Sequence, residues 1–174
     1  SSDLSESGAE VFEVKYFGQK AYLAQSPQFY KQMAIIAGLG KIYESAPVFR
    51  AEPSFSSRHA TEFVSFDVEL EGVTHEHELI ALECAMVRHA MAATRAAMGS
   101  ELLEHYPQAV VPGPEKVMTF AQAQALLGIA GEESLTAEQE RTLGAMMAKE
   151  GFELVALTQV PWKQRPFYHH KEGE

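Results

Sequence analysis

Apolar residues follow two kinds of spacing along this chain, helical in some stretches and alternating in others. Helical spacing predicts helices over residues 26–37, 75–98, 119–127 and 136–149. Alternation predicts strands over residues 11–16, 20–24, 48–53, 61–70 and 153–158. Turn residues between successive strands indicate hairpins, and hairpins build antiparallel sheets. The pattern therefore predicts an α+β fold, an antiparallel β-sheet flanked by helices.

Local signals mark several ends of these elements. Phe17-Gly18-Gln19 reads as the turn of the first hairpin. Ser26 followed by Pro27 reads as a capping hydroxyl and a proline at the first helical position, and Gly38 ends that helix. Gly99 closes the long helix that starts at His75.

The strand over residues 61–70 has two different faces, because side chains alternate on a strand. One face carries polar groups among its members, which are Phe63, Ser65, Asp67 and Glu69. The other is wholly apolar and is predicted to face the core, and its members are Val64, Phe66, Val68 and Leu70. On the preceding strand Arg50 and Glu52 point the same way. Spacing alone leaves two readings open, a floor for a polar ligand or a surface hairpin with solvated charges.

Length and composition suit one cytoplasmic domain. We take the domain to span residues 1–174, and 46% of its residues are apolar, which is enough for a core. No stretch approaches the roughly 20 apolar residues of a membrane span. The first residues lack the basic-then-apolar pattern of a secretory signal. We therefore expect no membrane association.

Cysteine content and charge narrow the chemistry further. The single cysteine, Cys84, excludes an internal disulfide and a multi-cysteine metal site, and we expect it in the core. The net charge is −10, whereas chains that bind nucleic acid mainly through their own surface are usually basic. His75 and His77 stand two residues apart and should diverge on a helix, so we predict no metal site there.

A family resemblance covers almost the whole chain. The segment Phe49–Phe63 contains Phe-Arg-Ala-Glu, a short loop, Arg-His and Thr-Glu-Phe. It resembles motif 2 of class II aminoacyl-tRNA synthetases, which would then lie at about residues 47–70. Its amino-acid sequence is similar to that of the archaeal-type aspartyl-tRNA synthetases. Gln25–Gln32 resembles their aspartate-binding segment, and Ser5–Phe12 their lid over the amino acid. Leu135–Glu138 and Arg165–Tyr168 match as well.

The resemblance implies an adenylate-forming site that uses ATP and Mg²⁺. Arg50, the implied catalytic residue, would bind the α-phosphate, and arginine suits phosphate because its fork donates two parallel hydrogen bonds. The implied ATP-binding residues are Arg50, Glu52, Arg58 and His59. The implied aspartate-binding residues are Glu6, Gln28, Lys31 and Asp67, with Lys31 pairing with the side-chain carboxylate. The bland alternative for Lys31 is a solvated surface lysine.

The resemblance is also incomplete. We find no counterpart of motif 1, of the Gly-rich motif 3 or of the OB-type anticodon-binding domain, so we expect a catalytic-domain fragment that is inactive alone, or a truncated relative. His169-His170 replaces the family's usual Thr-Met, and we expect a loop over the site there. The complete enzyme would be a homodimer that charges tRNA with aspartate.

Three other functions stay open. They are a truncated non-catalytic paralogue, an ammonia-dependent relative that forms asparagine, and an asparaginyl-tRNA synthetase. A neutral amide substrate would not require a lysine at Lys31, which favours aspartate.

Overall fold

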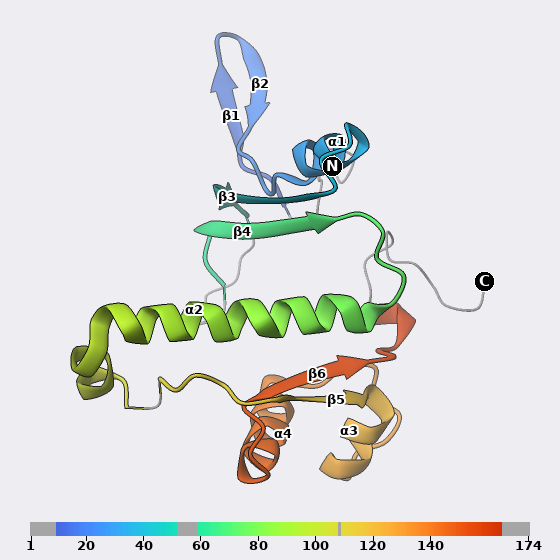
Figure 1. Cartoon of the computed structure of the whole chain (residues 1–174). Helices are drawn as coiled ribbons and strands as arrows, with labels where there is room; N and C mark the ends of the chain where they lie inside the picture. The colour runs from blue at the N-terminus through green and yellow to red at the C-terminus, as the bar shows by residue number, and fades with distance from the viewer. Residues whose placement is uncertain (1–9, 52–58, 108, 165–174) are drawn as a thin grey trace. The chain divides into compact units, whose positions relative to one another are not determined.

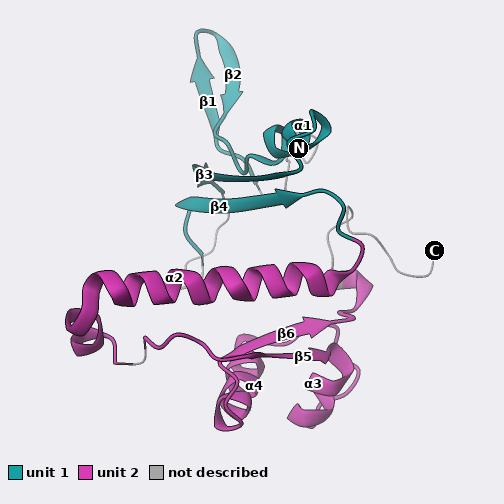
Figure 2. Ribbon diagram, in the orientation of Figure 1, with its two compact units in different colours: residues 1–73 teal, residues 74–174 magenta. Residues whose placement is uncertain are grey.

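The structure, a computed structural model, describes residues 10–51, 59–107 and 109–164 (Figure 1). Contacts divide the chain into two compact units, residues 1–73 and residues 74–174 (Figure 2). Each unit mixes helices with a small sheet, so the predicted α+β class is confirmed.

Unit 1 opens with the predicted hairpin. Strand β1, Glu13–Tyr16, pairs antiparallel with strand β2, Gln19–Tyr22, and Tyr16 lies opposite Gln19. The turn is therefore the two residues Phe17 and Gly18, one fewer than predicted. Both have positive φ, 47° and 77°, as a type I′ turn requires. This turn is common in two-residue hairpins because its twist matches that of the flanking strands.

Helix α1, Gln28–Ile36, follows the hairpin. The N-cap is Pro27 and no described side chain caps the helix, so the predicted cap at Ser26 and first helical position at Pro27 are each one residue early. The Ser26 Oγ still accepts a hydrogen bond from the Gln28 N–H at 3.1 Å. Gly38 ends the helix with φ of 92°, which glycine adopts without steric cost. The helix packs against the next two strands.

Those strands form the second antiparallel pair of unit 1. Strand β3, Lys41–Phe49, pairs with strand β4, Glu62–Leu70, with Val48 opposite Phe63. The predicted strand over residues 48–53 shares only Val48 and Phe49 with β3, which starts seven residues earlier and contains Pro47. A proline is tolerated where its missing N–H faces away from the partner strand.

The predicted core face of β4 is wrong at Val64 and Phe66, whereas its other two members, Val68 and Leu70, are half-buried. Val64 and Phe66 are 69% and 58% exposed, whereas Ser65, Asp67 and Glu69 are half-buried. The reason lies in α1, whose Lys31 contacts Asp67 and therefore covers the polar face of the sheet. Alternation in the sequence distinguishes two faces but does not say which of them a helix will cover.

Unit 2 begins with the long helix α2, Glu76–His105. Gly99 has φ of 54° and ψ of −128°, so the helix breaks at the predicted glycine and a short segment continues beyond it. His75 is the N-cap in extended conformation, and its Nδ1 accepts the His77 N–H at 3.2 Å. The two rings stack with centroids 4.8 Å apart, so the predicted divergence of these histidines is wrong.

The rest of unit 2 is a parallel strand pair with two helices. Strand β5, Glu115–Thr119, pairs with strand β6, Leu154–Thr158, and helices α3, Phe120–Leu127, and α4, Ala137–Lys149, lie between them in sequence. A 3₁₀ helix, Trp162–Gln164, follows. The prediction missed β5, and an antiparallel arrangement is wrong for this pair.

The core of unit 2 lies where these elements meet. Its buried side chains are Met118, Ala123, Leu143 and Met147. Cys84 of α2 is also buried, as predicted. Arg88 of α2 donates through Nε to the Gly113 carbonyl at 2.9 Å and pairs with Glu115, which ties the helix to the start of β5.

The cap of α4 gives a test of the local structure. Thr136 Oγ1 accepts the Gln139 N–H, and Gln139 Oε1 accepts the Thr136 N–H at 2.7 Å, a capping box. Thr136→Ala should therefore lower the free energy of unfolding by about 1 kcal/mol. Urea unfolding followed by circular dichroism measures the change.

Thr142→Ala is the matched control. The Thr142 hydroxyl bonds to the Glu138 carbonyl within α4, where alanine has the higher helix propensity, so this variant should lose nothing. Equal losses in the two variants would show that the capping box contributes no stability of its own.

Candidate functional site

Lys31 is the centre of the candidate site in unit 1. Helix α1 presents Lys31 to the polar face of β4, and the residue is only 4% exposed. Its ammonium lies 3.0 Å from Asp67 Oδ1 and 3.6 Å from Glu69 Oε2. A buried charge is strongly disfavoured unless it is paired, so these carboxylates are what makes the burial possible. The solvated-lysine alternative is wrong.

Asp67 has one oxygen engaged and one unused. Its Oδ1 accepts from Lys31, whereas its Oδ2 is buried and has no hydrogen-bond partner within the described part of the chain. Burial raises the pKa of Asp67, but hydrogen bonds from Ser65 and Lys31 and the charge of Arg50 outweigh it, so the pKa lies below its ordinary value. A buried acceptor without a donor suits a ligand that brings an N–H group.

The lowered pKa of Asp67 predicts a dependence of stability on pH. A depressed folded-state pKa stabilises the fold above the ordinary value of 3.8, and this contribution is lost as pH falls through the folded pKa. Asp67→Asn should therefore be less stable than wild type at pH 7 by about 1–3 kcal/mol, with the gap closing below that value. Urea midpoints across pH 7 to 2.5 measure it.

Glu62→Gln controls for the loss of a carboxylate as such, because Glu62 is an exposed residue at the start of the same strand. It should leave the stability gap near zero at every pH. An Asp67→Asn gap that stays constant down to pH 2.5 would contradict the ion pair as its cause.

Arg50 lies directly after β3 on the same face of the sheet as Asp67. Its backbone N–H donates to the Thr61 carbonyl at 3.0 Å, which extends the strand pairing by one residue. The guanidinium carbon lies 5.5 Å from the centre of the Phe63 ring, a cation–π contact. The Nε atom is buried without a hydrogen-bond partner in the described residues. Arg50 is thus a fixed cation with one donor unused.

Of the other predicted site residues, the structure describes Gln28 and His59. Gln28 is the first residue of α1 and stands one turn before Lys31, so the two side chains share a helix face. His59 is exposed and precedes β4. Glu6, Glu52 and Arg58 lie outside the described residues, as does the predicted loop at His169 and His170.

The structure adds Glu69 to the predicted set. Alternation along β4 already placed it on the same face as Asp67, but nothing in the sequence showed that this face would meet a buried lysine. The structure therefore brings two cations, Lys31 and Arg50, and the carboxylates of Asp67 and Glu69 together on one sheet face, which Glu44, opposite Asp67, also shares. Such an array can bind a ligand that carries both charges.

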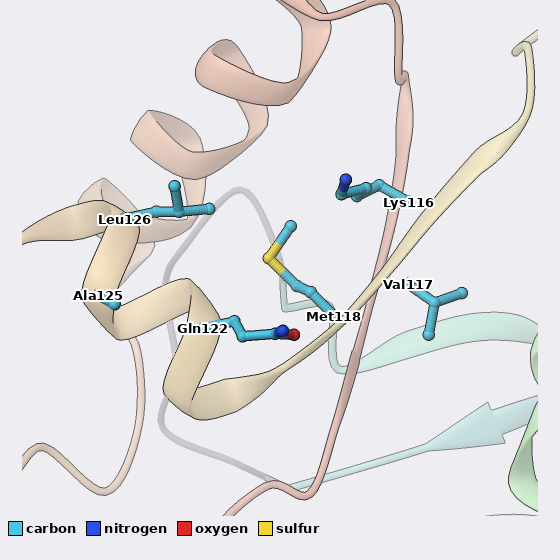
Figure 3. A pocket seen from close by; sticks show the side chains of 6 residues that line it. All are labelled: Lys116, Val117, Met118, Gln122, Ala125 and Leu126. Carbon is cyan, nitrogen blue, oxygen red and sulfur yellow. The ribbon is translucent and has the colours of Figure 1, made fainter.

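A separate pocket of about 480 Å³ lies in unit 2, between β5 and α3 (Figure 3). Its lining residues are Lys116, Val117, Met118, Gln122, Ala125 and Leu126. None of the predicted site residues lines it. The Lys116 ammonium lies 5.2 Å from the centre of the Phe152 ring.

The described ranges contain neither a metal-binding cluster nor a helix able to span a membrane. Residues 10–51, 59–107 and 109–164 contain no group of three or more His, Cys, Asp or Glu side chains arranged to hold a metal ion. In the same ranges, none of the helices combines the length and apolar character needed to cross a bilayer.

Comparison with known proteins identifies the family. All 174 residues match the family described as tRNA synthetases class II (D, K and N). The aspartate–tRNA(Asp/Asn) ligase of Aeropyrum pernix is 39% identical over 98% of this chain, and the match covers 40% of that relative. The chain thus spans well under half of the relative's length.

Solved structures agree with this assignment. Aspartyl-tRNA synthetase from Entamoeba histolytica has a TM-score of 0.74 and 36% identity, over 84% of this chain and 32% of that one. Asparaginyl-tRNA synthetase from the same organism, solved with asparaginyl-adenylate, has a TM-score of 0.76 and 27% identity, over 92% and 38%. The resemblance drawn from motif 2 is confirmed, and the chain belongs to the class II tRNA synthetases of the D, K and N group.

Proposed function

We propose that this chain is the amino-acid-binding part of the catalytic domain of an aspartate–tRNA ligase. In the complete enzyme, meaning this segment within a chain of its relatives' length, aspartate and ATP would form aspartyl-adenylate and release pyrophosphate. The aspartyl group would then pass to a tRNA hydroxyl with release of AMP. The name of the Aeropyrum relative supports this substrate.

The observation that carries the proposal is the buried Lys31 ammonium. Lys31 is 4% exposed and stands one turn after Gln28 on α1, so both side chains could reach one small ligand. A buried cation favours a ligand with a carboxylate side chain, because burying a carboxylate without a partner is strongly disfavoured. The unused Asp67 Oδ2 would accept from the ligand's ammonium group.

Arg50 supports the ATP half of the reaction. Its unused Nε donor and fixed guanidinium fit a phosphate oxygen, and adenylate formation depends on cations placed against developing phosphate charge. His59, Glu52 and Arg58 would contact the remainder of ATP. Mg²⁺ is included because ATP phosphates usually bind it. The described residues contain no group of three or more His, Cys, Asp or Glu side chains arranged to hold a metal ion.

Asparagine is the second candidate substrate. The solved neighbour with asparaginyl-adenylate shows that this fold also serves an amide side chain. Lys31 favours aspartate over it. A homodimer, a cytoplasmic location and tRNA as the acceptor complete the proposal and rest on the family resemblance.

Charging of tRNA tests the function. The complete enzyme, ATP, tRNA and labelled aspartate should give acid-precipitable aspartyl-tRNA. Without tRNA, only aspartate-dependent exchange of added labelled pyrophosphate into ATP should remain. Free asparagine formed from aspartate and ammonia without tRNA would instead indicate the amide-forming relative.

A further inference from the structure

The two carboxylates that share Lys31 hold it unequally. Asp67 Oδ1 lies 3.0 Å from the ammonium and makes a hydrogen bond. Glu69 Oε2 lies at 3.6 Å, an ion pair beyond hydrogen-bond distance. The Asp67 side chain is 21% exposed and that of Glu69 is 28% exposed. Glu69 is therefore the looser and more solvated partner.

Side-chain geometry makes Glu69 the carboxylate that can move. It stands two residues after Asp67 on the same face of β4, opposite Ile42 of β3. Glutamate has one more rotatable bond than aspartate, so its carboxylate can turn toward water while the strand stays fixed. No hydrogen bond to Lys31 is lost when it turns.

A carboxylate ligand that approaches Lys31 would meet Glu69 as a like charge at short range. With Asp67 already paired to Lys31, Glu69 and a ligand carboxylate would be a second and a third negative charge on one ammonium, so their mutual repulsion favours only one of them close to it. Asp67 stays in place because it holds the hydrogen bond and its second oxygen faces the ligand. The competition is therefore between Glu69 and the ligand.

We propose that Glu69 is an internal substitute for the ligand's side-chain carboxylate: it pairs with Lys31 in the empty site and is displaced when aspartate binds. This inference rests on the proposed function. Glu69 would then be a specificity-determining residue that keeps the buried lysine paired between turnovers and weakens the binding of acidic ligands.

The proposal predicts that removing a charged side chain from the site improves substrate binding instead of weakening it. Glu69→Gln in the complete enzyme should lower KM for aspartate by about tenfold, because it removes a competing charge that partial exposure only partly screens. KM for asparagine and for ATP should change little, since neither places a carboxylate on Lys31. A residue with a merely structural role would raise KM or lower kcat instead.

Stability gives a second readout that does not depend on catalysis. Without ligand, Glu69→Gln should lower the melting temperature, because Lys31 loses one of its two charge partners. Saturating aspartate should then raise the melting temperature more in the variant than in wild type, since tighter binding stabilises more.

Glu44→Gln is the matched control. Glu44 lies opposite Asp67 on the same sheet face, so the substitution makes the same change in charge, yet Glu44 forms no ion pair with Lys31. It should leave KM for aspartate close to the wild-type value. A tenfold fall in both variants would indicate a general field effect and overturn the specific competition.

The outcomes separate the two proposals. Pyrophosphate-exchange kinetics of the wild type come first: no exchange with aspartate would mean that the proposed function fails. A wild type active with aspartate, together with an unchanged or raised KM in Glu69→Gln, would overturn the role of Glu69 alone. If Glu69→Gln did not fold, Glu69→Asp, which withdraws the carboxylate from Lys31 by one methylene, should still lower KM for aspartate, and an unchanged value would count against the proposal.

Discussion

Arg50→Ala in the complete enzyme is expected to lose about 10²–10³ in kcat for aspartyl-adenylate formation, with a much smaller change in KM for aspartate. Arg50 is held by its backbone bond to Thr61 and by the Phe63 ring, and its buried Nε has no partner in the described residues. A fixed cation with an unused donor can stabilise the negative charge that grows on the phosphate in the transition state. Contacts that are stronger in the transition state than with bound substrate affect kcat.

The rate of single-turnover adenylate formation at saturating ATP, measured by chemical quench, reports this effect directly. Arg50→Lys keeps the charge but loses the two-pronged donor, so it should fall between wild type and alanine. A variant in which only KM for aspartate rises would show that Arg50 binds the amino acid and does not act on the phosphate.

Lys31→Met in the complete enzyme is expected to lose aspartate as a substrate. Removing one member of a buried charge pair costs about 2–5 kcal/mol, so kcat/KM for aspartate should fall roughly 30- to 5,000-fold. Asparagine, which brings no carboxylate side chain, should be affected far less. The carboxylates left behind, Asp67 and Glu69, would add repulsion against the acidic ligand.

The measurement is kcat/KM for pyrophosphate exchange with each amino acid. Lys41→Met is the control, because Lys41 is an exposed lysine at the start of β3 in the same unit. It should leave both amino acids unaffected. An unaltered ratio of aspartate to asparagine in Lys31→Met would show that Lys31 does not recognise the side chain and would favour asparagine as the substrate.

Elements with strong local signals were predictable from the sequence. The Ser26 hydroxyl and Gly38 bracket α1, and Thr136 caps α4 with a partner three residues later. These signals act within one turn of helix, so they depend little on the rest of the fold. The first hairpin was also predictable, although the sequence assigned three residues to its turn and the structure has two.

Elements defined by distant partners were not predictable in this way. Strand β5 starts with Glu115 and Lys116 and follows a proline-rich stretch, so its pattern is weak, and its parallel partner β6 begins only at Leu154. Likewise, the alternation of Val64 and Phe66 reveals an apolar face but not that α1 packs on the opposite one. Tertiary packing decides both questions.

The candidate site shows the same division. The family resemblance selected Arg50, Lys31 and Asp67, and strand alternation placed Asp67 and Glu69 on one face. What the sequence does not contain is the burial of Lys31, which follows from the docking of α1 on that face and makes Glu69 a second partner. Composition alone would have assigned this lysine to solvent.

The most direct test of the account is pyrophosphate exchange by the wild-type complete enzyme with aspartate, asparagine and lysine side by side, the three amino acids of its family. A buried ammonium paired through Asp67 predicts that kcat/KM for aspartate exceeds that for each of the other two by at least about 100-fold. An enzyme that activates asparagine or lysine as well as aspartate, or better, would contradict the assignment of Lys31 as the residue that selects the substrate.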